Sequence, residues 1–164
     1  MVEATKSIEI QVLRYRPEQE EKPVWQSYQV PFTEDMSVLQ GLQYIKDEID
    51  GSVSFRWSCR MAICGSCGMM INRKPSLSCQ TFLRDLAPGP VRVEALDHLP
   101  IERDLVVSVE PFVKKLESIK PYLIPTEERA LSEGEYLQTP AQLEAFEQYS
   151  SVYRLFCWAP AQGR

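Results

Sequence analysis

The stretch RWSCRMAICGSCG, residues 56–68, decides how this chain is interpreted. It contains the spacing C-x4-C-x2-C in Cys59, Cys64 and Cys67, and Cys79 follows after eleven intervening residues. This is the plant-type spacing for a 2Fe-2S cluster, in which one loop supplies three ligands and a distant strand supplies the fourth. Thiolates suit such a centre because they are soft, anionic ligands that hold iron in tetrahedral sulfur coordination. The pattern therefore predicts a 2Fe-2S site at these four cysteines.

The residues between and around the cysteines suit a loop that wraps closely around bound sulfide. Gly65, Ser66 and Gly68 leave the backbone free to approach, so that its N–H groups donate to sulfur. Four cations are expected either to offset the negative charge of the cluster or to be ordinary solvated charges: Arg56, Arg60, Arg73 and Lys74. Three apolar residues are expected to be core residues or a cover that keeps water off the cluster: Trp57, Met61 and Ile63.

Structural zinc is the main alternative for the cysteines. Zinc modules usually carry two C-x2-C pairs, and this sequence has one. Four buried, inert thiols at this spacing are a weaker alternative. His98 is the single histidine, so no metal site with two histidines can be built within the chain. Cys157 stands alone near the end and is expected to be a small apolar side chain.

Composition excludes several classes of protein. The chain has 164 residues, of which 44% are hydrophobic and 25% charged, so wholesale disorder is excluded. No apolar run is long enough to span a membrane, and the N-terminus lacks the apolar core of a secretory signal. The net charge of -5 argues against binding to nucleic-acid phosphates. We expect a soluble, cytosolic protein whose clustered thiols bind metal rather than form disulfides.

The first hundred residues predict a small domain of short strands packed on one helix. Residues 7–16 alternate apolar and polar side chains and residues 25–32 resemble a second strand, so the two are expected to form a hairpin. Ser37 and Gln40 form a capping box ahead of residues with helical spacing.

Further strands are expected on both sides of two turns. They are residues 68–72, residues 78–82 pairing back on them, and residues 91–94. These elements predict a small α+β domain that ends near residue 100.

The remainder of the chain has a different character. Apolar residues at helical spacing predict an amphipathic helix over residues 105–119, and residues 125–138 are polar like a linker or long loop. Thr139 and Gln142, with a proline between them, open a second helix whose apolar face includes Leu143 and Phe146. Because two helices cannot close a core alone, we expect this half to expose apolar surface.

The cysteine loop, extended to residue 70, resembles that of the iron–sulfur subunit of fumarate reductase and succinate dehydrogenase. Residues 100–107, PIERDLVV, are similar to the passage between the two domains of that family. Residues 139–142, TPAQ, resemble the segment ahead of its second cluster motif. The resemblance covers about residue 7 to about residue 150. It favours the fumarate reductase type, because Cys67 stands where some succinate dehydrogenases have aspartate.

This resemblance implies a β-grasp 2Fe-2S ferredoxin-like domain over residues 1–103 and the beginning of an incomplete helical domain over residues 104–164. It implies that Cys59 and Cys64 bind one iron, while Cys67 and Cys79 bind the other. It further implies an enzyme subunit without its own substrate site, which passes single electrons between the FAD of a flavoprotein subunit and quinone. Membrane anchor subunits would then hold the complex on the cytoplasmic face of the inner membrane. The alternatives are a self-standing ferredoxin-like carrier and a zinc-stabilised interaction module.

The sequence departs from this family after Ser150. The family continues with C-x2-C-x2-C-x3-C-P runs for 4Fe-4S and 3Fe-4S clusters, whereas here only Cys157 follows. The expected cause is a frameshift or early stop, and the alternative is a genuinely short protein. In either case we expect that this chain alone does not support quinone-linked turnover.

Overall fold

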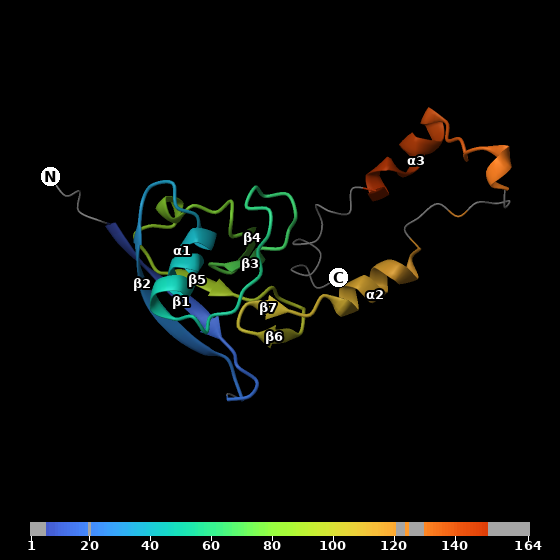
Figure 1. Ribbon diagram of the computed structural model, residues 1–164. Coiled ribbons are helices and arrows are strands. Elements are labelled where there is room, and N and C mark those ends of the chain that lie inside the picture. Colours follow the sequence, from blue (N-terminus) through green and yellow to red (C-terminus); the bar gives the residue numbers. More distant parts are fainter. Residues whose placement is uncertain (1–5, 20, 121–123, 125–129, 151–164) are drawn as a thin grey trace. The chain divides into compact units, whose positions relative to one another are not determined.

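The computed structural model describes residues 6–19, 21–120, 124 and 130–150. The described residues belong to two compact units, one that runs to Ser108 and one that begins at Val109. The first contains a mixed sheet and its covering helix, and the second contains two helices (Figure 1). The sequence-based boundary after residue 103 stays a prediction.

The sheet of the first unit has five strands in the order β2-β1-β5-β3-β4. Its strands are β1 (Lys6–Arg14), β2 (Val24–Phe32), β3 (Gly68–Ile71), β4 (Lys74–Leu77) and β5 (Val91–Glu94). β1 and β2 form the expected antiparallel hairpin, and β5 runs parallel to β1 at the centre of the sheet. This mixed sheet with its helix confirms the α+β, β-grasp prediction.

One helical segment covers the sheet. α1 (Val38–Tyr44) continues without a break into the π-helical turn η1 (Ile45–Ile49). The predicted capping box is present: Ser37 Oγ accepts the N–H of Gln40, and Gln40 Oε1 accepts the N–H of Ser37.

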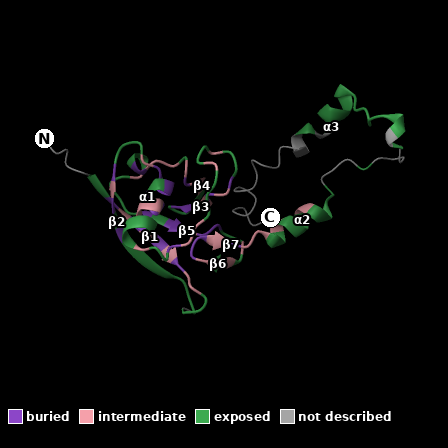
Figure 2. Cartoon of the chain, viewed as in Figure 1, coloured by how far each residue is buried: buried purple, intermediate pink, exposed green. Residues whose placement is uncertain are grey.

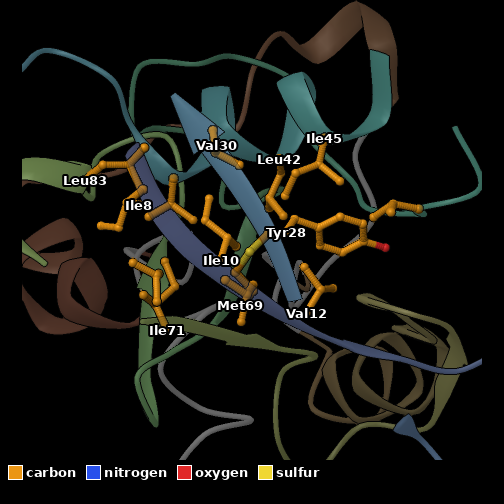
Figure 3. Close-up of a cluster of buried hydrophobic side chains, with 14 of the residues drawn as sticks. Ile8, Ile10, Val12, Tyr28, Val30, Leu42, Ile45, Met69, Ile71 and Leu83 are labelled. Carbon is orange, nitrogen blue, oxygen red and sulfur yellow. The ribbon is translucent and has the colours of Figure 1, made fainter. Parts of the chain in front are cut away.

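The core lies between this helix and the sheet. Figure 3 shows side chains from β1, β2, β3 and α1 meeting there. Figure 2 shows β3 as mostly buried, whereas much of β2 is exposed. The members of the core include Ile8, Ile10, Val12, Tyr28, Val30, Leu42, Ile45, Met69, Ile71 and Leu83. Leu83 belongs to η2 (Leu83–Asp85), a 3-10 turn that follows the last cysteine of the site.

The expectation that residues 78–82 form the strand pairing with β3 is wrong. The partner is β4, which begins earlier because Asn72 and Arg73 reverse the chain in two residues, with φ of 48° and 65°. Left-handed conformations at both positions are those of a two-residue hairpin turn matched to the strand twist. Pro75 is tolerated within β4 because the strand lies at the edge of the sheet.

The predicted helix over residues 105–119 begins later than expected. Leu105 is instead buried in the core of the first unit, beside the short hairpin of β6 (Ile101–Arg103) and β7 (Val106–Val107). Asp104, between these strands, has a φ of 47°, which ends one strand and starts the next.

In the second unit, α2 (Glu110–Ser118) and α3 (Pro140–Ser150) are joined by a stretch that includes the short 3-10 turn η3 (Leu131–Glu133). Thr139 and Gln142 form the predicted capping box of α3. Apolar side chains are exposed here, as expected, at Val113, Ile119 and Leu143. Part of the predicted linker, and the side chain of Phe146, lie outside the described residues. Among the described helices, none has the length and apolar character needed to cross a membrane.

Candidate metal centre

The cysteine loop joins η1 to β3 and makes tight left-handed turns. Arg60, Ala62 and Gly65 have φ of 58°, 59° and 72°. Glycine adopts this conformation freely, but it costs a residue with a side chain about 1–2 kcal/mol. Such strain persists only where the surroundings enforce it, and it concentrates at ligand sites. Gly65 is one of the residues expected to let the backbone approach bound sulfide, whereas nothing in the sequence marks Arg60 and Ala62 as left-handed residues.

These turns direct backbone N–H groups at the first cysteine. The N–H of Cys64 lies 3.4 Å from Cys59 Sγ, and the N–H of Met61 lies 3.5 Å from it. Donation from the N–H groups of Met61, Cys64 and Ile63 lowers the pKa of Cys59 to about 6. The loop therefore stabilises a thiolate at Cys59, which is the protonation state that ligates iron.

Cys67 and Cys79 are held together by the residue that separates β4 from Cys79. The N–H and hydroxyl of Ser78 both donate to the carbonyl oxygen of Cys67, at 3.2 and 3.1 Å. Ser78 is fully buried, and its own carbonyl accepts the N–H of Leu39 in the first turn of α1. Cys79 is thereby fixed between the end of the loop and the start of the helix.

The side chain of Cys79 is in a different environment from that of Cys59. Burial raises the pKa of Cys79 to about 11, and the neighbouring thiol of Cys67 contributes to the rise. The N–H of Ala62, one of the left-handed residues, acts in the opposite direction on the same sulfur. Cys67 itself is buried, whereas Cys64 is exposed. Cys59 and Cys79 are half-buried, so exposure within the site increases from Cys67 through Cys59 and Cys79 to Cys64.

The four cysteines lie close enough to interact with one another. Cys59 interacts with Cys64, Cys79 interacts with Cys67, and Cys79 also lies close enough to Cys59 for their charges to interact. In the part of the chain that the structure describes, no three His, Cys, Asp or Glu side chains form a group that could hold a single metal ion. Paired thiols are the donor set of a binuclear centre, which needs two protein ligands on each iron. The lone Cys157 lies outside the described residues.

The apolar residues of the loop are not part of the core, contrary to the first of their two expected roles. Met61 and Ile63 are 66% and 72% exposed, and Trp57 is 41% exposed. The guanidinium of Arg60 stacks over the ring of Trp57, 4.3 Å from its centroid. Arg56 is also exposed, so the loop presents an apolar and basic surface immediately outside the cysteines. Arg73 is exposed in the β3–β4 turn and Lys74 is exposed at the start of β4, and their expected effect on the cluster stays a prediction.

Comparison with known proteins agrees with this arrangement. A family model described as a 2Fe-2S iron-sulfur cluster binding domain matches residues 9–114. The chain is 56% identical, over 143 residues, to the fumarate reductase iron-sulfur subunit of Mycobacterium tuberculosis, covering 87% of this chain and 58% of that protein. It is 51% identical to the corresponding subunit of Haemophilus influenzae, covering 86% of this chain and 59% of the relative.

More distant likenesses point the same way. The mitochondrial succinate dehydrogenase iron-sulfur subunit of Dictyostelium discoideum is 39% identical, covering 72% of this chain and 42% of that subunit. Among solved structures, a chain of the Mycobacterium smegmatis Sdh1 complex in the apo form matches with a TM-score of 0.81 at 23% identity, covering 96% of this chain and 64% of that one. The resemblance drawn from the cysteine loop is confirmed. The chain spans about three fifths of the length of the first two relatives.

Proposed function

We propose that this chain, which belongs to the family of 2Fe-2S iron-sulfur cluster binding domains, is an electron-transfer subunit of a succinate/fumarate oxidoreductase. Its cluster would be held by Cys59, Cys64, Cys67 and Cys79. The observation that carries the proposal is that these four thiols interact with one another, from one strained loop and from the turn that follows β4. The similarity to fumarate reductase iron-sulfur subunits supplies the class of reaction.

The ligands are assigned in two pairs: Cys59 with Cys64 on one iron, and Cys67 with Cys79 on the other. A bound 2Fe-2S cluster accepts and donates one electron at a time, which couples a flavin that handles two electrons to carriers that handle one. The N–H groups around Cys59 stabilise negative charge on its sulfur. Cys64, the exposed ligand, then lies nearest to any partner, and Cys67, the buried ligand, faces the protein.

The partner that we propose is the FAD-containing subunit of the complex. The exposed side chains of Trp57, Met61 and Ile63 lie on the same loop as three of the cysteines and offer apolar contact area to a partner, and Arg56 and Arg60 add positive charge to this loop. Aromatic residues, methionine and arginine are enriched at protein interfaces. A partner seated there would exclude water from the exposed ligand and approach the cluster closely.

Onward transfer to quinone, through membrane anchor subunits at the cytoplasmic face of the inner membrane, is the wider role that we propose because the family resemblance implies it. The expectation that this chain alone does not support quinone-linked turnover stays a prediction.

A pair of matched variants tests this function. Trp57 and Trp25 are 41% and 42% exposed, and each lies under an arginine, so Trp57→Ala and Trp25→Ala remove similar side chains from different places. With the flavoprotein subunit and succinate added, we expect the reduced-cluster EPR signal in the wild type and in Trp25→Ala. The signal should form more slowly in Trp57→Ala. A cluster that dithionite reduces but succinate with flavoprotein does not would indicate a self-standing carrier instead.

A further inference from the structure

A guanidinium is buried at the end of β1. The side chain of Arg14 is 1% exposed and is surrounded by partners. Its Nε donates to Asp104 Oδ1 at 2.8 Å, its Nη1 to Asp50 Oδ2 and Tyr28 Oη at 2.8 Å, and its Nη2 to Ser52 Oγ at 3.0 Å. A buried charge is strongly unfavourable unless it is paired and hydrogen-bonded, so these partners fix each other in one arrangement.

The carboxylate of Asp104 connects this network to the backbone of Ser54. Its side chain is 0% exposed, and besides Arg14 it accepts the N–H of Tyr15 at 3.1 Å and the N–H of Ser54 at 2.9 Å. The next residue, Leu105, donates its own N–H to the carbonyl of Ser54 at 3.2 Å. Both backbone polar groups of Ser54 are therefore bound by residues 104 and 105.

Ser54 lies on the segment that leads into the cysteine loop. Residues 50–58 connect η1 to Cys59 and belong to none of the helices or strands among the described residues. Without a strand ladder, the segment depends on other bonds to fix its backbone. Those bonds come from the network at Ser52 and Ser54, and from Lys46 Nζ, which donates to the carbonyl of Val53 at 2.7 Å. Ser54 precedes Cys59 by only five residues, so its position limits where that ligand can lie.

We propose that Arg14 and Asp104 are positioning residues of the cluster site. They hold the segment at Ser52 and Ser54 from which the first ligand extends, and they do so through hydrogen bonds to that segment rather than to the cysteines. This inference rests on the proposed function, since it takes Cys59 as a ligand. Substitution of outer-shell residues, which orient the metal ligands without binding the metal, typically changes metal affinity or activity by about 10–100-fold.

The substitution Asp104→Asn tests this role because it keeps the size of the side chain. Three donors converge on the carboxylate, from Arg14, Tyr15 and Ser54. An asparagine amide turns one of its two positions into a donor. If its oxygen stays with Arg14, its NH2 group meets the N–H of Ser54 and the tie to the loop segment is lost.

A matched control separates positioning from general stability. Val30→Ala shortens a fully buried side chain on β2, the edge strand opposite β4, and Val30 makes none of the hydrogen bonds of the network given above. Each full-length variant is loaded with the cluster, and the rate of cluster loss to a chelator is followed by absorbance. Each variant is measured at a temperature that lies the same number of degrees below its own midpoint of thermal unfolding. We expect the rate of cluster loss to be at least about tenfold higher in Asp104→Asn than in Val30→Ala. Equal rates in the two variants would overturn the proposal.

A second readout does not depend on the cluster. Hydrogen exchange of the apoprotein should become faster at the amides of residues 54–57 in Asp104→Asn and stay unchanged there in Val30→Ala. Unchanged exchange in both variants would contradict the positioning role, even if the wild type binds no cluster and the proposed function fails. If Asp104→Asn does not fold, Ser52→Ala decides the question: it removes the two bonds of the Ser52 hydroxyl, from Arg14 Nη2 and to Asp50 Oδ1, and leaves Arg14 and Asp104 unaltered, and we expect cluster loss to be several-fold faster. A wild-type rate in Ser52→Ala would then count against the proposal.

Discussion

Gly41 gives the sharpest test of how the helix packs on the sheet. It lies in the middle of α1, where a Cβ would be 2.8 Å from Ile10 Cδ1 and 3.4 Å from Leu83 Cδ1. Replacing glycine by alanine inside a helix is favourable by about 1 kcal/mol. Inserting a methyl group into a filled core costs about 1–3 kcal/mol. Because the contact with Ile10 is well below van der Waals distance, we expect Gly41→Ala to destabilise the first unit by about 1 kcal/mol.

Removing Cδ1 should reverse the sign of that effect. Ile10→Val alone should cost about 1 kcal/mol, as such substitutions typically do. In its presence the new methyl group has space, so Gly41→Ala should then stabilise by about 0.5–1 kcal/mol. The coupling between the two changes is therefore expected to be about 1.5–2 kcal/mol.

The assay is urea unfolding of the wild type, the two single variants and the double variant. As the control, a second cycle uses Ile8→Val in place of Ile10→Val. Ile8 is equally buried in β1, but it is not among the three nearest contacts of the Gly41 position. Additive free energies of unfolding for Gly41→Ala and Ile10→Val would refute the packing argument, as would equal coupling to Ile8→Val.

Three further predictions concern pH and turn strain. Burial and the hydrogen bond to Asp50 raise the pKa of Tyr28 to about 12, so the unfolded chain releases this proton first; stability should fall between about pH 10 and pH 12, and Tyr28→Phe should flatten that alkaline limb in a circular-dichroism titration. The hydroxyl of Ser52 holds the pKa of Asp50 well below its ordinary value of 3.8, so its stabilisation is present above about pH 4 and is lost as the pH falls; Asp50→Asn should be less stable at pH 7 and show a shallower acid limb. Arg73→Gly should increase the free energy of unfolding by about 0.5–1 kcal/mol, and so raise the unfolding midpoint, because glycine adopts the left-handed conformation in the β3–β4 turn without strain. An unchanged midpoint would argue against strain there.

Much of the fold follows from local patterns in the sequence. Alternation in β1 and the capping boxes at Ser37 and Thr139 each depend on nearby residues, and they are present as expected. The start of β4 differs from the prediction because Pro75 favours a turn in the sequence, whereas an edge strand tolerates proline.

The parts that were missed depend on contacts between distant residues. The alternation of Ile8, Ile10 and Val12 continues to Arg14, which was a signal that this arginine faces the core. Its partner Asp104 lies ninety residues away, and no local pattern links the two. The same holds for Ser78, whose bond to Cys67 orients the buried cysteine of the site.

The ligand assignment at the four cysteines is tested most directly by metal analysis of the full chain after anaerobic reconstitution with iron and sulfide. Iron and acid-labile sulfide are measured together with the EPR spectrum after dithionite reduction, in the wild type and in Cys79→Ser. If the four cysteines bind the cluster, we predict two irons and two sulfides per wild-type chain, the signal of a reduced 2Fe-2S cluster, and loss of that cluster in Cys79→Ser. A chain that instead retains one zinc ion and no sulfide, or a Cys79→Ser variant with an unaltered cluster, would contradict this ligand assignment.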